Sequence, residues 1–278
     1  MKTFNTLANT TANAAHAAPA TQHFTFFDIE THWDEVLHNN YCFIQHTESW
    51  PPRIAARRIH AAAAFDLALA GDGAITCERI ASWTLPHDGG EKGVVEGLFT
   101  HMRARPEGTC MVGYGSIAMD VPVLKLAAME YGLVLPDQLI ASAGDWKAAW
   151  RPHLDLGLAI KGKGKTWHHL TEILVRLGIQ ANLLRDKAKV GYPQDLDGWA
   201  ELRSHVELDT VLTAAATMAW ARSQGHAGIN PATASHALLQ WWSRHGALSA
   251  RFVERVGLAS GALWRRIGSK APELADAA

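Results

Sequence analysis

Hydrophobic and polar positions along the chain follow a strand-like period in some segments and a helical period in others. Residues 23–30 (HFTFFDIE) combine aromatic and β-branched residues, which is typical of a short buried strand. Residues 57–85 predict two strands joined at Gly71-Asp72-Gly73, a hairpin signal. The alanine run at 61–64 is compatible with either a strand or a helix. Residues 109–115 (TCMVGYG) predict another short strand that ends in glycines.

Helical spacing dominates the rest of the chain. It predicts helices over residues 91–104, 120–133, 166–178, 198–222 and 232–268. Residues 1–22 are rich in Ala, Thr and Asn and carry one charge, so we expect a disordered tail there. Glycines and Pro231 break the pattern after residue 224. The expected organisation is a tail (1–22), an α/β domain (23–224) and a small all-α region (232–270).

Charge and cysteine content narrow the classes of function. The 278-residue chain has 26 Lys and Arg residues against 27 Asp and Glu, which excludes a uniformly basic polyanion-binding protein. Residues 220–270 nevertheless hold seven Lys or Arg residues and one acid, a local net charge of +6. No apolar run approaches the roughly 18 residues of a membrane span, so we expect no membrane partner. The three cysteines lie far apart, which fits a reducing cytoplasm better than a disulfide framework.

Acidic residues recur at the ends of predicted elements. Asp28 and Glu30 are two apart, so both side chains would share one face of the first strand. A buried face with two carboxylates needs a compensating cation or partner. The alternative is that the strand ends near Asp28 and both acids cap the following loop. Asp120 opens a predicted helix and could equally be its N-cap.

His205 and Asp209 are four residues apart in the long predicted helix. They therefore share a face, one turn apart. That face continues with apolar residues, which indicates that both side chains point inward or into a cleft. The alternative is an ordinary surface pair.

The order of these motifs resembles the DEDD superfamily of 3′–5′ exonucleases, which have a ribonuclease H-like fold. Within this superfamily, residues 23–222 are similar to the bacterial and phage group related to the proofreading exonuclease of family-B DNA polymerases. The matching segments are FFDIET (26–31), EKGVVEGLF (91–99), VGYGSIAMDVPVL (112–124), HLDL (153–156), HLTEILVRLGI (169–179) and RSHVELDTVLTAAATMAWAR (203–222). Asp155, in HLDL, is expected to cap a helix.

The resemblance implies a fold, an activity and a site. It implies a mixed sheet flanked by helices, and a nuclease that releases nucleoside monophosphates from the 3′ end of DNA. Two Mg²⁺ or Mn²⁺ ions would act in phosphodiester hydrolysis. The implied metal ligands are Asp28, Glu30, Asp120 and Asp209. His205 would orient or deprotonate the attacking water, a task that suits an imidazole with an ordinary pKa near 6.5.

Two positions depart from the family pattern. Gly115 stands where the family usually has Asn, which removes a polar group near the substrate. His205 stands at the spacing of the family's Tyr-x-x-x-Asp motif, whereas the histidine branch has a longer spacing. The alternatives to a DNA exonuclease are a 3′–5′ exoribonuclease and a non-catalytic nucleic-acid-binding protein with a degenerate site. The expected substrate is single-stranded or 3′-ended DNA, and the preference over RNA rests on the resemblance alone.

Two basic segments are candidates for nucleic-acid contact. Lys161, Lys163 and Lys165 alternate with glycines in a loop that either contacts a phosphate backbone or is simply solvated. Residues 249–267 resemble a helix-turn-helix with its turn at Gly257, which would bring Arg265 and Arg266 to DNA. The alternative is an amphipathic helical cap that packs Trp241, Trp242, Phe252 and Trp264 on the core.

Overall fold

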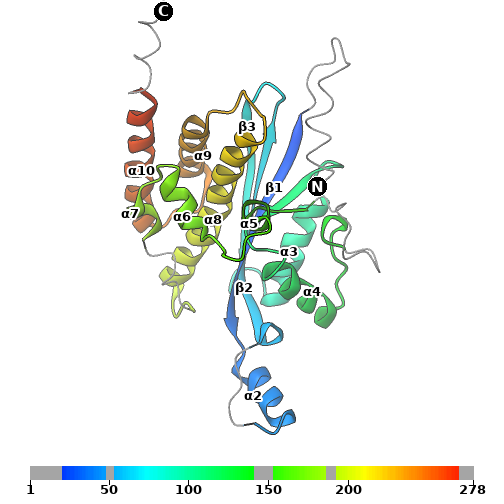
Figure 1. Ribbon diagram of the computed structural model, residues 1–278. Helices are drawn as coiled ribbons and strands as arrows, with labels where there is room; N and C mark the ends of the chain where they lie inside the picture. The colour runs from blue at the N-terminus through cyan, green and yellow to red at the C-terminus, as the bar shows by residue number, and fades with distance from the viewer. Residues whose placement is uncertain (1–20, 48–52, 141–152, 186–191, 269–278) are drawn as a thin grey trace, which may run out of the picture.

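The computed structural model describes residues 21–47, 53–140, 153–185 and 192–268 (Figure 1). Residues 1–20 of the expected disordered tail lie outside these ranges. The elements in chain order are β1 (Gln22–Trp33), α2 (Glu35–Ile44), η2 (Ile54–Ala56), β2 (Arg57–Leu69), β3 (Ile75–Thr84), α3 (Glu91–Arg103), β4 (Cys110–Gly113), α4 (Asp120–Tyr131), η3 (Asp137–Leu139), β5 (His153–Asp155), α5 (Leu156–Lys161), α6 (Leu170–Arg176), α7 (Ala181–Leu184), α8 (Leu196–Ser223), α9 (Pro231–His245) and α10 (Ala250–Gly268).

The strands form one mixed sheet in the order β3-β2-β1-β4-β5. The strand β2 runs antiparallel to both of its neighbours, β1 and β3. The strands β4 and β5 run parallel to β1. Helices flank the sheet, and a helical region ends the described chain. This confirms the predicted α/β fold class, a mixed sheet flanked by helices.

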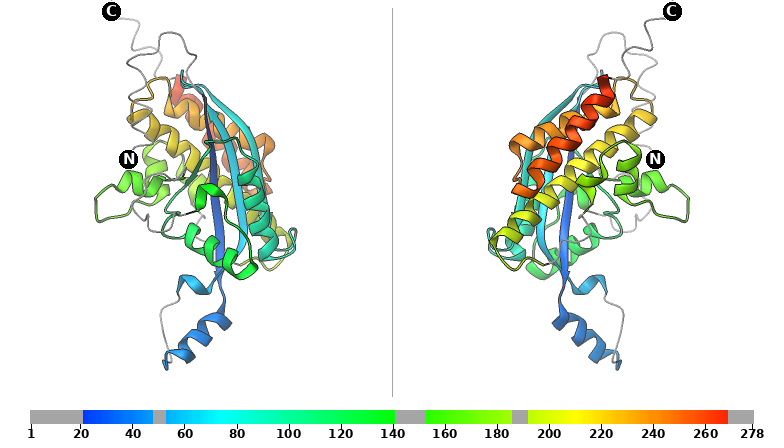
Figure 2. Two further views of the ribbon diagram at one scale, coloured as in Figure 1. Left: turned by 90° about the vertical axis from the view of Figure 1, so that its right-hand side faces the viewer. Right: turned by 90° about the vertical axis from the view of Figure 1, so that its left-hand side faces the viewer.

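Helices cover both faces of the sheet (Figure 2). Alternation along β1 sends Phe24 and Phe26 into a core shared with α8 and α9. Phe27 and Ile29 point the other way, into a second core formed with α3 and α4. The strand is therefore buried on both faces, and its even-numbered residues face α8.

The alanine run belongs to a strand, β2, which resolves the ambiguity in its sequence. Ala61 and Ala63 contact Leu202 and Val206 of α8. The alternate alanines, 62 and 64, pack in the core on the α3 side. All four alanines are fully buried. Their small side chains let a helix approach the sheet closely from each face, so the run reflects packing rather than helix propensity.

The C-terminal helices belong to the same core as the sheet. Trp242 of α9 is fully buried in the cluster that contains Phe24 and α8. Residues 250–268 form one uninterrupted helix, α10, so the predicted helix-turn-helix is wrong. Gly257 lies within this helix, and Val253, one turn before it, is 58% exposed. Without a proline or a capping residue at Gly257, the strong amphipathic pattern continues the helix through it.

The alternative of an amphipathic cap describes this region better. Phe252 is buried beside Trp242, with ring centroids 6.2 Å apart. Trp241 is partly buried against the same core. Trp264 differs from the expectation because it is 62% exposed. Within the described residues, no helix is both long enough and apolar enough to cross a membrane.

Candidate active site

The first two acids of the motif lie within a strand. β1 continues to Trp33, so Asp28 and Glu30 are strand residues and do not cap a loop. Both are half-buried and lie on the face that packs against α8. A β-bulge follows Glu30, because Glu30 pairs with Ala61 whereas Thr31 pairs with Ile59. The bulge locally increases the twist of the strand pair next to the candidate site.

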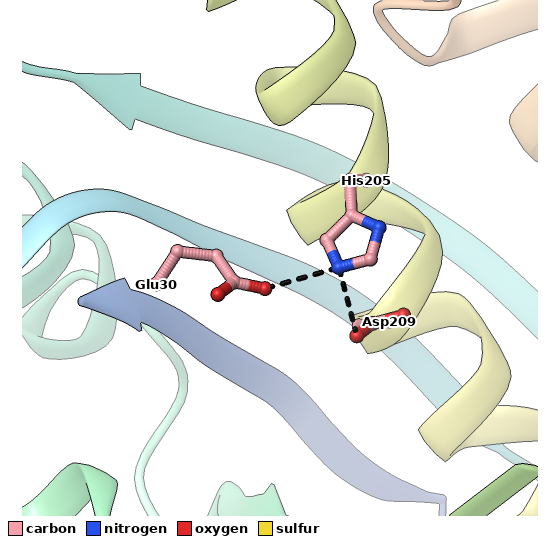
Figure 3. A group of neighbouring side chains, drawn as sticks. All are labelled: Glu30, His205 and Asp209. Carbon is pink, nitrogen blue, oxygen red and sulfur yellow. Dashed lines mark ion pairs between the residues drawn. The ribbon is translucent and has the colours of Figure 1, made fainter. Parts of the chain in front are cut away.

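His205 and Asp209 approach Glu30 from α8 (Figure 3). The His205 Nε2 atom lies 3.1 Å from Oε1 of Glu30 and 3.7 Å from Oδ2 of Asp209. The His205 side chain is 4% exposed and that of Asp209 is 16% exposed, which argues against a surface pair. Glu30, His205 and Asp209 each offer a ligand atom within 4.8 Å of the others. The helical i,i+4 spacing and the strand position together make this cluster.

Asp120 is buried at the start of α4 rather than capping it. The N-cap residue is Met119, and no side chain caps this helix. Burial, aided by the neighbouring Glu30 and Asp155 and opposed by Arg57, raises the pKa of the Asp120 carboxyl to about 8. A carboxylate that is both desolvated and close to other acids favours a proton or a cation.

Asp155 fixes the loop that leads to Asp120. Its Oδ1 accepts the N–H groups of Gly115 and Leu158, both at 3.0 Å, and its Oδ2 accepts that of Ile117 at 2.9 Å. The expected helix cap is therefore present, since Leu158 lies in the first turn of α5. The same carboxylate also ties the 115–117 loop to β5. It thereby sets where α4 begins.

The residues expected to bind metal come from β1, α4 and α8, but they do not form one compact set. Glu30 and Asp209 converge with His205. Asp120 lies close enough to Glu30 for the Glu30 carboxylate to raise the pKa of Asp120. Asp28 shares the face of Glu30 but lies outside the 4.8 Å group. Carboxylate oxygens suit Mg²⁺ or Mn²⁺, which prefer oxygen ligands. The donor set therefore fits the divalent ions implied by the family.

Gly115, the first departure from the family pattern, has a left-handed backbone. Its φ is +69°, and a Cβ added there would meet no heavy atom within 4 Å. Glycine and asparagine are the residues that tolerate this conformation best. The conformation therefore suits both residues, and in this chain the 115 backbone N–H donates to Asp155.

The basic loop follows α5 on the side of Asp155. Lys163 and Lys165 are exposed, and Lys161 Nζ lies 5.0 Å from the centre of the Trp167 ring. Trp167 packs so closely on Gly157 that a Cβ there would approach its ring to 2.9 Å. The lysine loop is thus anchored beside the segment that positions Asp120.

Arg265 and Arg266 lie on α10, away from this cluster of acids. Arg265 is exposed, and Arg266 donates a hydrogen bond to the Leu177 carbonyl at 2.6 Å. The turn at Gly257 that a helix-turn-helix requires is not formed, so the reason to expect these arginines at DNA is gone. Arg266 instead ties α10 to the turn after α6.

Four rings that contact one another between β1, β2 and α8 were not expected from the sequence. His32, His60, Tyr192 and Trp199 contact one another, with His32 two residues after Glu30 and Trp199 six residues before His205. Arg57 was also missed, although it donates to Thr31 Oγ1 at 2.6 Å and lies over the Trp33 ring. The β-bulge was the feature needed to find the rings, because it inserts His60 opposite the junction of Glu30 and Thr31.

Comparisons with known proteins found similarity at the level of structure. No protein-family model and no curated protein sequence matches the chain. The family B DNA polymerase from the hyperthermophilic archaeon Pyrobaculum calidifontis is similar, with a TM-score of 0.44, 16% identity, and coverage of 84% of this chain and 30% of the polymerase. A structure of exonuclease I is similar with a TM-score of 0.38, 12% identity, and coverage of 79% of this chain and 45% of that one.

The zinc-bound complex of E. coli exonuclease I with single-stranded DNA has a TM-score of 0.36 and 13% identity, over 73% of this chain and 41% of that one. The chain spans less than half the length of each of these proteins. The function proposed below therefore rests on the arrangement of side chains.

Proposed function

We propose that this protein is a metal-dependent 3′–5′ exonuclease that hydrolyses phosphodiester bonds of DNA and releases nucleoside monophosphates. The observation that carries the proposal is the meeting of Glu30, His205 and Asp209, which come from a strand and a helix far apart in sequence. The buried Asp120 next to Glu30 extends the acidic site. Clustered, desolvated carboxylates destabilise a fold unless they serve a ligand.

In this proposal Asp28, Glu30, Asp120 and Asp209 would hold two Mg²⁺ or Mn²⁺ ions. When bound, such ions neutralise charge on the transferring phosphoryl group and activate water. The imidazole of His205 would orient the attacking water and accept its proton. Its contacts with Glu30 and Asp209 hold the ring at the position where those carboxylates converge. The apolar packing around α8 restricts the rotamers of the ring.

The lysine loop and Arg57 would contact the negatively charged backbone of the substrate. Lys161, Lys163 and Lys165 follow the segment that positions Asp120, so a strand entering the site from that side would meet them. Such contacts give affinity without sequence preference and weaken with salt. DNA is preferred to RNA in this proposal because the group of exonucleases that the sequence motifs resemble is related to DNA polymerases.

The test is degradation of a 5′-labelled single-stranded DNA oligomer with Mg²⁺ or Mn²⁺. We expect a ladder that shortens from the 3′ end with wild type and disappears with Asp209→Asn. The matched control is Glu201→Gln, because Glu201 is an exposed carboxylate on the same helix, paired with Arg251 at 3.1 Å. An RNA oligomer of the same sequence is run in parallel.

Three outcomes would change the proposal. Degradation of RNA alone would make the protein an exoribonuclease. Binding of DNA and RNA without degradation by wild type, with either metal, would make it a non-catalytic binding protein. Equal activity of wild type and Asp209→Asn would show that the observed cleavage arises elsewhere.

A further inference from the structure

A groove runs between α9 and α10, which lie side by side at the surface turned to the viewer in the right-hand view of Figure 2. It is open to solvent and has a volume of about 670 Å³. Gln240 and Ser243 line it from α9, and Val253, Gly257 and Trp264 line it from α10. These residues recur at helical spacing, so the groove follows one face of each helix and has the shape that a further helix fills. We call it the α9–α10 groove.

An exposed apolar side chain stands near each end of this face of α10. Val253 is 58% exposed and Trp264 is 62% exposed. The Trp264 ring is held in place by His236, whose ring centroid lies 5.2 Å away and whose Nδ1 atom lies 3.0 Å from the Ser260 carbonyl oxygen. Between the two ends the face is open, because a Cβ added to Gly257 would meet no heavy atom within 4 Å. A large aromatic ring that is both exposed and held by its neighbours is typical of the centre of a protein interface.

The same face of α10 carries one acid and one base that the rest of the described chain does not use. Glu254 and Arg265 are exposed and eleven residues apart, about three helical turns. Among the described residues, neither has an ion pair or a side-chain hydrogen bond. In contrast, Arg251 pairs with Glu201 at 3.1 Å, and Arg266 donates to a backbone carbonyl of its own chain. Glu254 and Arg265 are therefore available to a partner.

The order of residues along this face is self-complementary. When two identical helices pack antiparallel about a two-fold axis, positions at equal distances on either side of the axis meet. An axis within one residue of position 259 brings together three pairs, each made of one residue from either copy: Gly257 with Gly261, Val253 with Trp264, and Glu254 with Arg265. Small residues then meet small ones, apolar side chains meet apolar ones, and each acid meets a base. The chemistry of the face therefore matches a second copy of itself.

We propose that the α9–α10 groove is the interface of a homodimer, in which α10 packs antiparallel against α10 of a second copy. The two α9–α10 hairpins would then form a four-helix bundle, with Trp264 of each copy in the groove of the other. Long-range repulsion between the copies is small because the net charge of the whole chain is only -1. The inference goes beyond the proposed nuclease function and does not depend on it.

The experiment measures the oligomeric state of the full chain by sedimentation velocity, from low micromolar to a few hundred micromolar protein at physiological salt. Wild type should pass from monomer to dimer as its concentration rises. Trp264→Ala should raise the dissociation constant by roughly thirtyfold or more, the effect of losing an aromatic hot spot. The matched control is Leu196→Ala at the start of α8, which also removes a largely exposed apolar side chain and should dimerise like wild type.

Exchanging the two charges tests the two-fold arrangement directly. Glu254→Arg places arginine against Arg265, and Arg265→Glu places glutamate against Glu254, so each variant alone should be monomeric. Mixing the two variants should restore a dimer, because both charge pairs of the mixed dimer are then of opposite sign. The double variant Glu254→Arg/Arg265→Glu should also dimerise. Glu107→Arg, the same change of charge at an exposed position before β4, should leave the dimer intact.

Three results would overturn the inference. A wild-type monomer at every concentration would leave the groove to a different chain. Dimers of both single charge variants that are as tight as the wild-type dimer would place the contact on another surface. Monomers in both the mixture and the double variant would exclude the antiparallel two-fold pairing. An unchanged circular dichroism spectrum confirms that each variant is folded, as expected for substitutions at exposed positions.

Discussion

Nε2 of His205 lies 3.1 Å from Oε1 of Glu30, so a buried imidazole on α8 meets a carboxylate on β1. The contact joins two residues that are 175 positions apart in the sequence. It depends on an i,i+4 spacing that also carries Asp209 to the same ring, at 3.7 Å. A histidine at the family's tyrosine spacing can therefore reach the acidic cluster without a longer motif.

Replacing His205 tests whether the imidazole moves a proton. We expect His205→Gln to lower the cleavage rate of a single-stranded oligomer by about 10²- to 10⁴-fold, the usual contribution of a general base. His205→Tyr, which restores the family's residue, should retain more activity than His205→Gln because a phenol can still position water. The measurement is the initial rate at saturating oligomer with Mg²⁺.

A binding control separates chemistry from substrate affinity. Both His205 variants should bind the oligomer in EDTA with an affinity close to that of wild type. A His205→Gln variant as active as wild type would assign the reaction to the carboxylates alone and reduce His205 to a packing residue.

Removing the charge of Asp120 should stabilise the metal-free protein. Burial and the neighbouring acids raise the pKa of this carboxyl to about 8, which means that ionising it opposes folding. One pKa unit corresponds to about 1.4 kcal/mol. Asparagine removes at least part of the cost of burying an ionisable group, so Asp120→Asn should raise the melting temperature by a few degrees in EDTA. Thermal unfolding with and without Mn²⁺ measures both states.

Adding Mn²⁺, in contrast, should stabilise wild type more than Asp120→Asn. Wild type should gain stability because the ion binds the folded state and offsets carboxylate repulsion. Asp120→Asn should gain much less, whereas Asp137→Asn, a change at the start of η3, should respond like wild type. An equal Mn²⁺ response in Asp120→Asn would remove Asp120 from the metal site.

The sequence predicted most of this site because local rules govern its parts. Strand alternation placed Asp28 and Glu30 on one face, and helical periodicity placed His205 beside Asp209. The assignment of the alanine run to β2 was not predictable from the local pattern, because it depends on helices that approach the sheet from both faces. The continuity of α10 was missed for another reason: the weak helix propensity of Gly257 favoured a turn, although the amphipathic pattern continues through it.

The contacts among His32, His60, Tyr192 and Trp199 were not predicted, for a different reason. His32 and His60 lie on paired strands, but their contact requires the extra residue of a β-bulge, and the position of this bulge cannot be predicted from the sequence. Trp199 and Tyr192 reach the same place only through the docking of α8 on the sheet. Such long-range contacts carry no spacing signal in a single sequence.

Stability should fall as the solution becomes acidic, and His60 should be one cause. Its folded-state pKa of about 4 lies below the roughly 6.5 of an unfolded histidine. Between these pH values the unfolded chain binds more protons than the folded protein does. The free energy of unfolding therefore increases as pH rises and decreases as pH falls. We expect His60→Phe, which keeps the ring, to lose less stability than wild type between pH 7 and pH 5.

Chemical denaturation at several pH values measures this slope. The matched control is His245→Phe, because His245 stacks on Trp241 at the exposed end of α9. This variant should retain the wild-type slope. If His60→Phe and wild type change in parallel with pH, His60 is not a source of the acid sensitivity.

Glu207 should connect the stability of the sheet to that of the C-terminal helices. Its buried carboxylate accepts hydrogen bonds from Ser82 Oγ on β3, from Trp242 Nε1 on α9 at 3.1 Å and from the Ala247 N–H at 2.7 Å. In Glu207→Gln one acceptor oxygen becomes a donor that faces these donors. We expect a loss of roughly 1–3 kcal/mol in the free energy of unfolding.

The shape of the unfolding curve then decides how the C-terminal region is organised. Because α9 shares a core with α8 and the sheet, wild type and Glu207→Gln should each unfold in one transition, shifted to a lower temperature in the variant. Glu201→Gln, which alters an exposed carboxylate on the same helix, should change stability by less than about 0.5 kcal/mol. Two separate transitions, with only one shifted by Glu207→Gln, would mean that residues 232–268 fold independently of the sheet.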